Sequence, residues 1–209
     1  MPKVTEAHLE ARRSQITDAA SACFARRGFH QCTMNDICAE SQLSPGAVYR
    51  YFSSKEEIIQ AMAEESRARI ASLIENVKSQ GGPPIRLLDQ LADIFFAPLD
   101  DPGCRPDCAV DIEVWAEAVR NPAVGDVLVR IIETLREPFA RIVRDAQERG
   151  DINPRLDADS AARLMISAYY GLLMQKALQP DVDVWHYVTA MKAMMGGFFW
   201  FGQKLERED

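Results

Sequence analysis

The sequence lacks the features that mark a membrane, secreted or strongly basic protein. No apolar stretch is long enough to span a bilayer, and the first residues lack the apolar region of a secretory signal. The net charge is −7, and the five cysteines form no disulfide framework. We therefore expect a cytoplasmic protein with no membrane partner, in which Cys23, Cys32 and Cys38 are small buried hydrophobic residues.

Motifs of the common catalytic sites are also missing. The chain has no GxSxG, phosphate-binding loop, HExxH or dinucleotide fingerprint. Its three histidines, His8, His30 and His186, fall in separate segments without the spacing of metal ligands. The sequence thus predicts no enzyme, no metal site and no cofactor.

Helical periodicity is present along most of the chain, and no segment shows the alternation of a strand. Beyond two short helices between residues 33 and 52, the pattern predicts helices over 6–27, 55–79, 85–97, 107–120, 123–149, 157–178 and 182–205. Pro138, inside one of them, should kink it. The predicted fold class is all-α.

The stretch 33–55 contains two short helix patterns separated by a tight turn. Thr33, with Asp36 three residues later, can form a capping box at the start of the first helix. Ser44 can cap the second helix, and Pro45 occupies its first helical position. These signals predict a helix-turn-helix.

The second of these helices has the character of a helix that contacts DNA. On a helical wheel Val48 and Phe52 face the core. The opposite face carries Gly46, Ala47 and Arg50, so the backbone can approach base edges and Arg50 can bind guanine with two hydrogen bonds. Phosphate contacts are expected from the side chains that flank this face, namely Thr33, Ser44, Tyr49, Tyr51 and Lys55. Pro45 completes the predicted set of nine DNA-binding residues.

The charge of the chain is divided unevenly. Residues 1–55 contain seven Lys or Arg and five Asp or Glu, giving +2 and leaving −9 on the remainder. DNA binding requires a local basic surface rather than a basic total. The asymmetry predicts that one region binds DNA and another has a different role.

Residues 12–62 resemble the DNA-binding domain of the TetR family of bacterial transcription regulators. The resemblance lies in RGFHQCTMNDIC, LSPGAVYRYF and SKEEII, although Gln42 stands where the family usually has glycine. It implies a three-helix DNA-binding domain over residues 1–54 and a larger helical domain for ligand binding and dimerisation over 55–209. If position 42 needs a positive φ, glutamine there is strained by about 1 kcal/mol or somewhat more.

The same resemblance implies a repressor that binds a palindromic operator in double-stranded DNA and is released by a small-molecule effector. A largely apolar ligand pocket is expected in the second domain, with Phe95, Trp115, Met165 and Tyr169 as candidate lining residues. Each of them is also a reasonable core residue. In the family the long helix, here 55–79, moves when ligand binds.

The last predicted helix, with the aromatic run at residues 198–201, carries too much apolar surface for an exposed C-terminal helix. Either its own chain encloses this helix or a second copy of the chain covers it. The resemblance implies a homodimer formed by the last two predicted helices from each subunit, which would place two recognition helices in successive major grooves. Two alternatives remain open. One is a regulator that senses thiol oxidation at Cys104 and Cys108, and the other is a helical small-molecule-binding protein with a vestigial DNA-binding domain.

Overall fold

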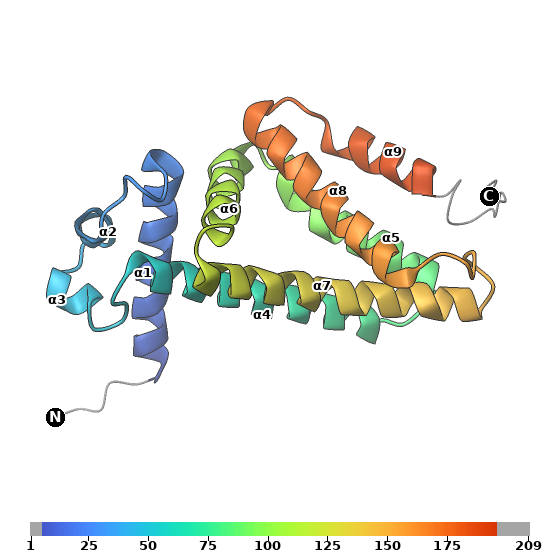
Figure 1. The fold of residues 1–209 in the computed structure, drawn as a ribbon, viewed down its shortest axis with the longest axis horizontal. Helices are drawn as coiled ribbons and strands as arrows, with labels where there is room; N and C mark the ends of the chain where they lie inside the picture. The colour runs from blue at the N-terminus through green and yellow to red at the C-terminus, as the bar shows by residue number, and fades with distance from the viewer. Residues whose placement is uncertain (1–5, 196–209) are drawn as a thin grey trace. The chain divides into compact units, whose positions relative to one another are not determined.

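The computed structural model describes residues 6–195, without the side chains of residues 6, 102 and 105–107. All regular structure in this range is helical (Figure 1): α1 Glu6–Arg27, α2 Met34–Ser41, α3 Pro45–Val48, α4 Lys55–Ser79, α5 Pro84–Phe96, η1 Ala97–Asp100, η2 Pro102–Cys104, α6 Arg105–Ala118, α7 Pro122–Glu148, α8 Ala158–Leu178 and α9 Val184–Met195. The predicted all-α class is confirmed.

The observed bounds of the longer helices differ from the predicted ones by no more than two residues, except at the end of α9. Residues 196–205 of the last predicted helix, with the aromatic run, lie outside the described residues. The second helix of the helix-turn-helix is shorter than expected. Regular α3 covers four residues, and the chain then continues to Phe52 through turn bonds such as Tyr51 N to Val48 O, 2.9 Å.

The chain forms two compact units, which do not coincide with the predicted division after residue 54. Unit 1 comprises residues up to Ala68 together with Arg105–Ile131, and unit 2 comprises Arg69–Cys104 together with the chain from Ile132 onward. α4 and α7 each contribute to both units. Sequence pattern could not show this division, because it depends on which helix faces pack together.

Unit 1 is built around the helix-turn-helix. Its core joins side chains of α1, α2, α3 and the first turns of α4, among them Phe24, Phe29, Ile37, Val48 and Phe52. α6 also packs against α1, and the Glu113 carboxylate on α6 accepts a bond from the Phe29 backbone N–H at 3.3 Å. The predicted core-facing positions of Val48 and Phe52 are confirmed, and the bond from Glu113 on α6 supports the turn that leads into α2.

The prediction that the cysteines of unit 1 are only small buried hydrophobic residues is wrong for two of them. Cys23, Cys32 and Cys38 are all buried, as expected, but Cys23 and Cys32 are joined by a disulfide. The bond links α1 to the residue just before the N-cap of α2. The sequence did not indicate it, because two cysteines nine residues apart meet only when Gly28 and Phe29 turn the chain back onto α1.

Unit 2 has a separate core. Its buried side chains come from the second half of α4 and from α5, α7 and α8, with Leu91, Phe139, Val143 and Ala162 at its centre. α9 contacts α5 and α8. No helix of the described chain is both long enough and apolar enough to cross a bilayer.

Candidate DNA-binding surface and effector pocket

A complete capping box starts α2, as the sequence predicts. The Thr33 hydroxyl accepts from the Asp36 N–H at 3.2 Å, and the Asp36 carboxylate accepts from the Thr33 N–H at 2.9 Å. Bonds from Thr33, with the nearby Arg27 guanidinium contributing, lower the pKa of Asp36. Asp36 is therefore an anion at neutral pH, and its bonds fix the direction in which α2 leaves the turn.

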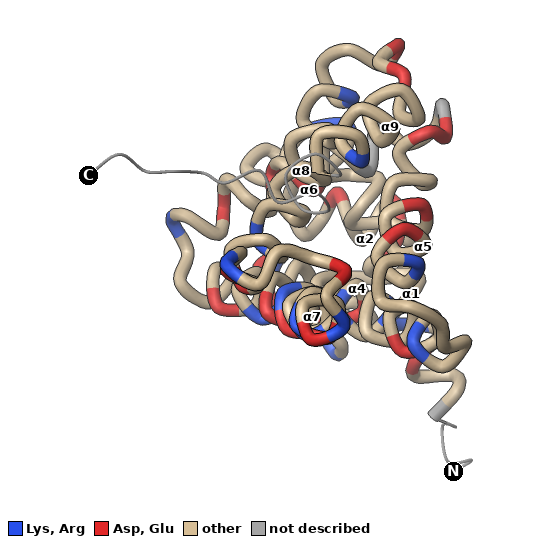
Figure 2. The backbone as a smooth tube through the Cα atoms, turned by 90° about the vertical axis from the view of Figure 1, so that its right-hand side faces the viewer, with Lys and Arg blue, Asp and Glu red and all other residues tan. Residues whose placement is uncertain are grey.

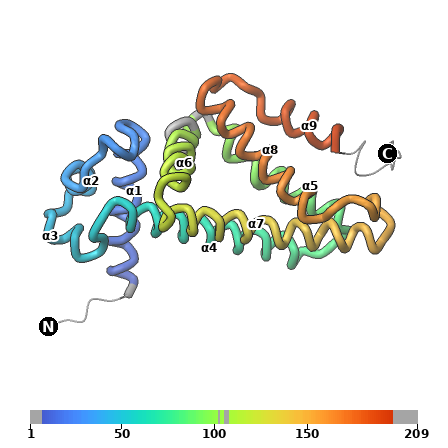
Figure 3. The backbone as a smooth tube through the Cα atoms, viewed as in Figure 1, coloured from blue at the N-terminus to red at the C-terminus, as the bar shows by residue number. Residues whose placement is uncertain are grey.

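Gln42 ends α2 in the left-handed conformation, with φ 57° and ψ 29°. The short α2–α3 connection is visible in Figure 3. Two bonds fix it, from Gln42 N to Ala39 O and from Leu43 N to Cys38 O, each 3.2 Å. The turn thus keeps the geometry that glycine would adopt freely, so Gln42 carries backbone strain.

Replacing Gln42 with glycine is expected to raise the free energy of unfolding by about 1 kcal/mol, because glycine has no Cβ to clash in this conformation. Urea denaturation followed by circular dichroism measures the change. The matched control is Ala39→Gly, which places glycine in the ordinary helical part of α2 and should lower stability by about 1 kcal/mol. A loss of stability in Gln42→Gly would show that the turn is not strained.

Two buried anchors orient α3. Val48 and Phe52 are fully buried in the core of unit 1, and the Arg13 guanidinium lies 4.6 Å from the centre of the Phe52 ring. The Ser44 hydroxyl accepts from the Ala47 N–H at 3.3 Å, so its own hydrogen can still be donated. The predicted cap and core-facing side are both present.

The face opposite these anchors is open. Pro45, Gly46, Tyr49 and Arg50 are exposed, whereas Ala47 and Tyr51 are partly buried beside them. A Cβ added at Gly46 would meet no atom within 4 Å, so packing within the chain does not require glycine there. Within the described residues Arg50 has no ion pair or side-chain hydrogen bond, and its guanidinium is free to bind a ligand.

Lys55 and Thr33 are more constrained than the other predicted phosphate contacts. The Lys55 ammonium donates to the Phe29 carbonyl oxygen at 2.6 Å and lies 4.4 Å from the centre of the Phe29 ring. The Thr33 hydroxyl donates to Asp36 at 2.6 Å. Lysine has three N–H donors, so Lys55 retains donors for a phosphate, but it also supports the turn before α2.

A pocket of about 430 Å³ lies between α5, α8 and α9 in unit 2. This size is within the range of small-molecule sites, roughly 300–1,000 Å³. Its described wall is largely apolar and includes Ile85, Leu88, Met165, Met191 and Met195, with three charged residues, Arg86, Asp89 and Lys192.

Lys192 on the pocket wall pairs with two aspartates of α5. Its ammonium lies 2.6 Å from an oxygen of Asp89 and 2.7 Å from an oxygen of Asp93. Partial burial alone would lower the pKa of Lys192, but the bonds to the two carboxylates outweigh it and raise the pKa. Lys192 is a cation, and it ties α9 to α5.

The four predicted lining residues do not gather at this pocket. Met165 is on its described wall, whereas the Phe95 ring packs 5.9 Å from Phe139 and the Tyr169 ring packs 5.8 Å from Phe96. Trp115 belongs to α6 in unit 1. The sequence pointed to the aromatic residues of these helices, but the pocket wall is made of methionine and aliphatic side chains.

Cys104 and Cys108 are both buried. The Cys104 thiol donates to the Leu99 carbonyl oxygen at 3.3 Å. Among the residues that the structure describes, no group of His, Cys, Asp and Glu is arranged to hold a metal ion. Neither position therefore offers the exposed thiol that the thiol-sensing alternative would use.

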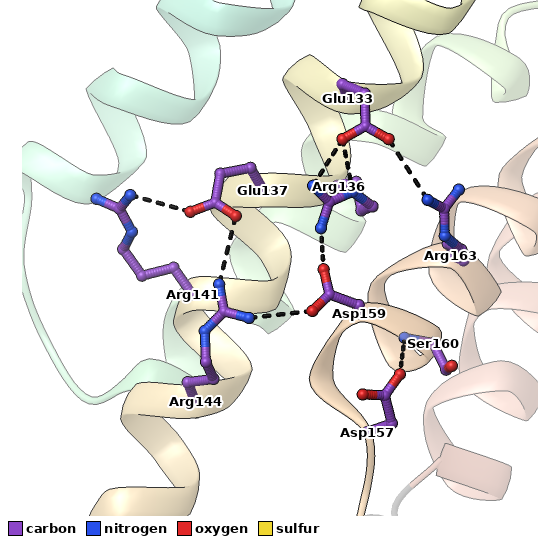
Figure 4. Close-up of polar contacts among 9 residues, drawn as sticks. All are labelled: Glu133, Arg136, Glu137, Arg141, Arg144, Asp157, Asp159, Ser160 and Arg163. Atoms are coloured by element: carbon purple, nitrogen blue, oxygen red, sulfur yellow. Dashed lines mark hydrogen bonds and ion pairs between the residues drawn. The ribbon is translucent and has the colours of Figure 1, made fainter.

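A network of ion pairs joins α7 to the start of α8 (Figure 4). Arg136 pairs with Glu133 and Asp159, Arg144 also reaches Asp159 at 3.2 Å, and Arg163 reaches Glu133 at 3.4 Å. Basic and acidic residues are interspersed along α7 in Figure 2. The network positions α8 against α7, and its opposite charges offset one another.

This network predicts a loss of stability in acid. A bond from Arg136 lowers the pKa of Glu133, and one from Arg141 lowers that of Glu137, from the ordinary value of 4.5. A carboxyl whose pKa is lower in the folded state stabilises the fold above its ordinary pKa, and this contribution disappears as the pH falls through the lowered value. We expect the urea midpoint to fall between about pH 6 and about pH 3. The urea midpoint of the double variant Glu133→Gln, Glu137→Gln should fall less than that of the wild type over this pH range. An equal fall in both proteins would exclude these two carboxylates as a cause.

The capped α2, the tight turn and the exposed face of α3 define a helix-turn-helix DNA-binding protein. Residues 16–62 match the model of bacterial regulatory proteins of the tetR family, and residues 84–196 match the C-terminal domain of BetI-type transcriptional repressors. The chain belongs to the TetR family of bacterial transcription regulators.

Characterised relatives agree with this assignment. The chain is 31% identical to the HTH-type transcriptional regulator UidR of Escherichia coli strain K12 over 187 residues, which cover 88% of this chain and 91% of UidR. It is 25% identical to the HTH-type transcriptional repressor DhaR of Mycobacterium sp. strain GP1, over 80% of this chain and 83% of DhaR. The structure of Salmonella enterica GusR superposes with a TM-score of 0.76 at 31% identity, covering 94% of this chain and 98% of GusR.

Proposed function

We propose that this regulator is a repressor that binds a palindromic operator as a homodimer and is released by a small, largely apolar effector. The observation that carries the DNA-binding part is Arg50. It is exposed in the turn that follows α3 and has no partner among the described residues, while Val48 and Phe52 on either side of it are buried in the core. We also propose that the protein is cytoplasmic, because the bacterial chromosome that it would bind lies in the cytoplasm.

In this proposal the nine predicted contact residues divide by role. Arg50 reads a base edge, and Gly46 and Ala47 let the backbone approach the groove. The remaining residues hold the DNA backbone or shape the start of α3: Thr33, Ser44, Pro45, Tyr49, Tyr51 and Lys55. Thr33 and Lys55 have second roles within the chain, so their replacement should alter stability as well as DNA affinity.

Exposed residues on α8 support a dimer through the last two helices. Leu164 and Met174 are exposed, and Leu178 is 81% exposed. With Ser167 and Gly171 between them, these positions are separated alternately by three and four residues, the spacing of a seam between two helices. A Cβ added at Gly171 would lie 3.9 Å from the Tyr187 hydroxyl of the same chain, an ordinary contact, so packing within the protomer does not require glycine there.

The dimer is tested by placing charge on this seam. In the double variant Leu164→Glu, Leu178→Glu, two exposed side chains become anionic, so the protomer should still fold, but like charges would face each other across the two-fold axis. Sedimentation velocity should show a monomer, and operator affinity should fall because one head makes only half of the contacts. The control is Val129→Glu, an exposed valine on α7 outside this seam. A double variant that remains dimeric would exclude the proposed interface.

The pocket between α5, α8 and α9 supports the effector part, with Met165 on its wall. The effector must favour one conformation of the protein over the other, because only differential affinity can change operator binding. Phe95, Trp115 and Tyr169 would then act from the surrounding packing rather than from this wall.

One experiment tests the whole proposal. Fragments that the purified protein binds are selected from random DNA, and the enriched site is used to screen compounds for release. A palindromic site with salt-dependent affinity supports the DNA-binding proposal. Absence of any enriched sequence at low salt would favour the small-molecule-binding alternative with a vestigial head.

A further inference from the structure

We infer that the pocket between α5, α8 and α9 takes an aliphatic molecule that ends in a carboxylate, with Arg86 binding the carboxylate. This inference rests on the proposed effector role and narrows it to a chemical class. It depends on two features of the pocket, the composition of the apolar wall and the pairing of its charges.

The wall favours an aliphatic body. Its apolar side chains are aliphatic or methionine, including Ile85, Leu88, Met165, Met191 and Met195. Among the described residues that line the pocket, none is aromatic and none bears a hydroxyl or amide group. A sugar would leave its hydroxyl groups without partners here, at a cost for each buried group. A flexible hydrocarbon chain suits methionine side chains, which adapt to irregular shapes.

The pairing of charges favours an anionic end group. Asp89 and Asp93 both lie against the Lys192 ammonium, so these carboxylates already have a cation. Arg86 lines the same pocket and has no ion pair or side-chain hydrogen bond within the described chain. Its planar guanidinium can hold a carboxylate with two parallel bonds.

A cationic ligand is disfavoured by the same geometry. It would have to displace the Lys192 ammonium from Asp89 and Asp93, and Lys192 is held beside them by the chain itself. An anion displaces nothing, because Arg86 is unpaired and the Lys192 ammonium has a third N–H. The net charge of this group is zero, because Arg86 and Lys192 offset Asp89 and Asp93. The preference for an anionic over a cationic ligand therefore depends on which charged side chain is unpaired, and this is Arg86.

The test compares three probes with the same eight-carbon body, octanoate, octanol and octylammonium, by calorimetry on the full chain without DNA. Octanoate should bind most tightly and octylammonium most weakly. Affinity should rise by about fourfold per CH₂ along the series from butanoate until the pocket is filled. Equal binding of octanoate and octanol, tighter binding of octylammonium, or no binding of any probe would overturn the inference.

Substitution locates the carboxylate. Arg86→Gln should reduce octanoate affinity by about tenfold, the effect of a charge-assisted pair at an exposed arginine, and leave octanol binding unchanged. Arg69→Gln, at an exposed arginine of α4 outside the pocket wall, is the matched control and should change neither. Octanoate binding that resists Arg86→Gln would place the carboxylate elsewhere and refute the assignment.

The outcome is separable from that of the proposed function. Operator binding is measured without ligand, and ligand binding is measured without DNA. Octanoate that binds through Arg86 but does not release the operator would confirm the pocket chemistry and contradict effector release. Release of the operator by a compound whose binding does not need Arg86 would support effector release and contradict the assignment of Arg86.

Discussion

Replacing Arg50 with alanine is expected to weaken operator binding by about 1–3 kcal/mol and to relax specificity at one base pair of each half-site. The structure gives the reason. Arg50 is exposed in the turn directly after α3, and no partner within the described chain competes for its guanidinium. Its removal should also leave the fold intact, because the buried contacts of this segment are made by Val48 and Phe52.

The measurement is a gel-shift titration on the operator and on random DNA of the same length. Arg50→Ala should lose more affinity for the operator than for random DNA. Arg50→Lys is the matched variant, because it keeps the charge but loses the planar pair of donors. It should bind random DNA normally while discriminating less. Equal losses on both DNAs would mean that Arg50 contacts phosphate and does not read sequence.

Reducing the Cys23–Cys32 disulfide is expected to lower the free energy of unfolding by about 2–3 kcal/mol. The bond closes a short loop between α1 and the residue before the N-cap of α2, which limits the conformations open to the unfolded chain. Since it lies in unit 1, the DNA-binding head should be the part that loses stability. In a reducing compartment the DNA-binding head would therefore have this lower free energy of unfolding.

Guanidinium chloride denaturation with and without a phosphine reductant, at one protein concentration, measures the effect. Both sulfurs are buried, so the protein should be reduced while unfolded and then refolded before the comparison. The double variant Cys23→Ala, Cys32→Ala is the control and should not respond to reductant. Cys38→Ala, at a free cysteine in the same core, should respond as the wild type does. A wild type with the same stability in both conditions would exclude a stabilising role for the bond.

The helix-turn-helix that carries the candidate DNA-binding surface was predictable because its signals are local. Thr33 with Asp36 and Ser44 with Pro45 start two helices, and each acts on atoms three or four residues away. The wheel positions of Val48 and Phe52 follow from helical periodicity alone. The strain at Gln42 depends on its positive φ, which the folded backbone shows and the local sequence does not determine.

The pocket between α5, α8 and α9 was not predictable to the same degree. Arg86 lies on α5, Met165 on α8 and Lys192 on α9, and nothing in their spacing says that these helices meet. The sequence favoured aromatic residues as lining, but the Phe95 ring packs against Phe139 and the Tyr169 ring packs against Phe96.

By itself, the sequence determined the all-α class, the positions of the helices, the helix-turn-helix and the outward-facing Arg50, because each depends on periodicity or capping within a few residues. Tertiary structure alone decided the Cys23–Cys32 bond, the inclusion of α6 in the unit that carries the head, and the pairing of charges that leaves Arg86 free in its pocket. These features bring together residues from different elements, and only the packing of those elements brings their side chains within bonding distance.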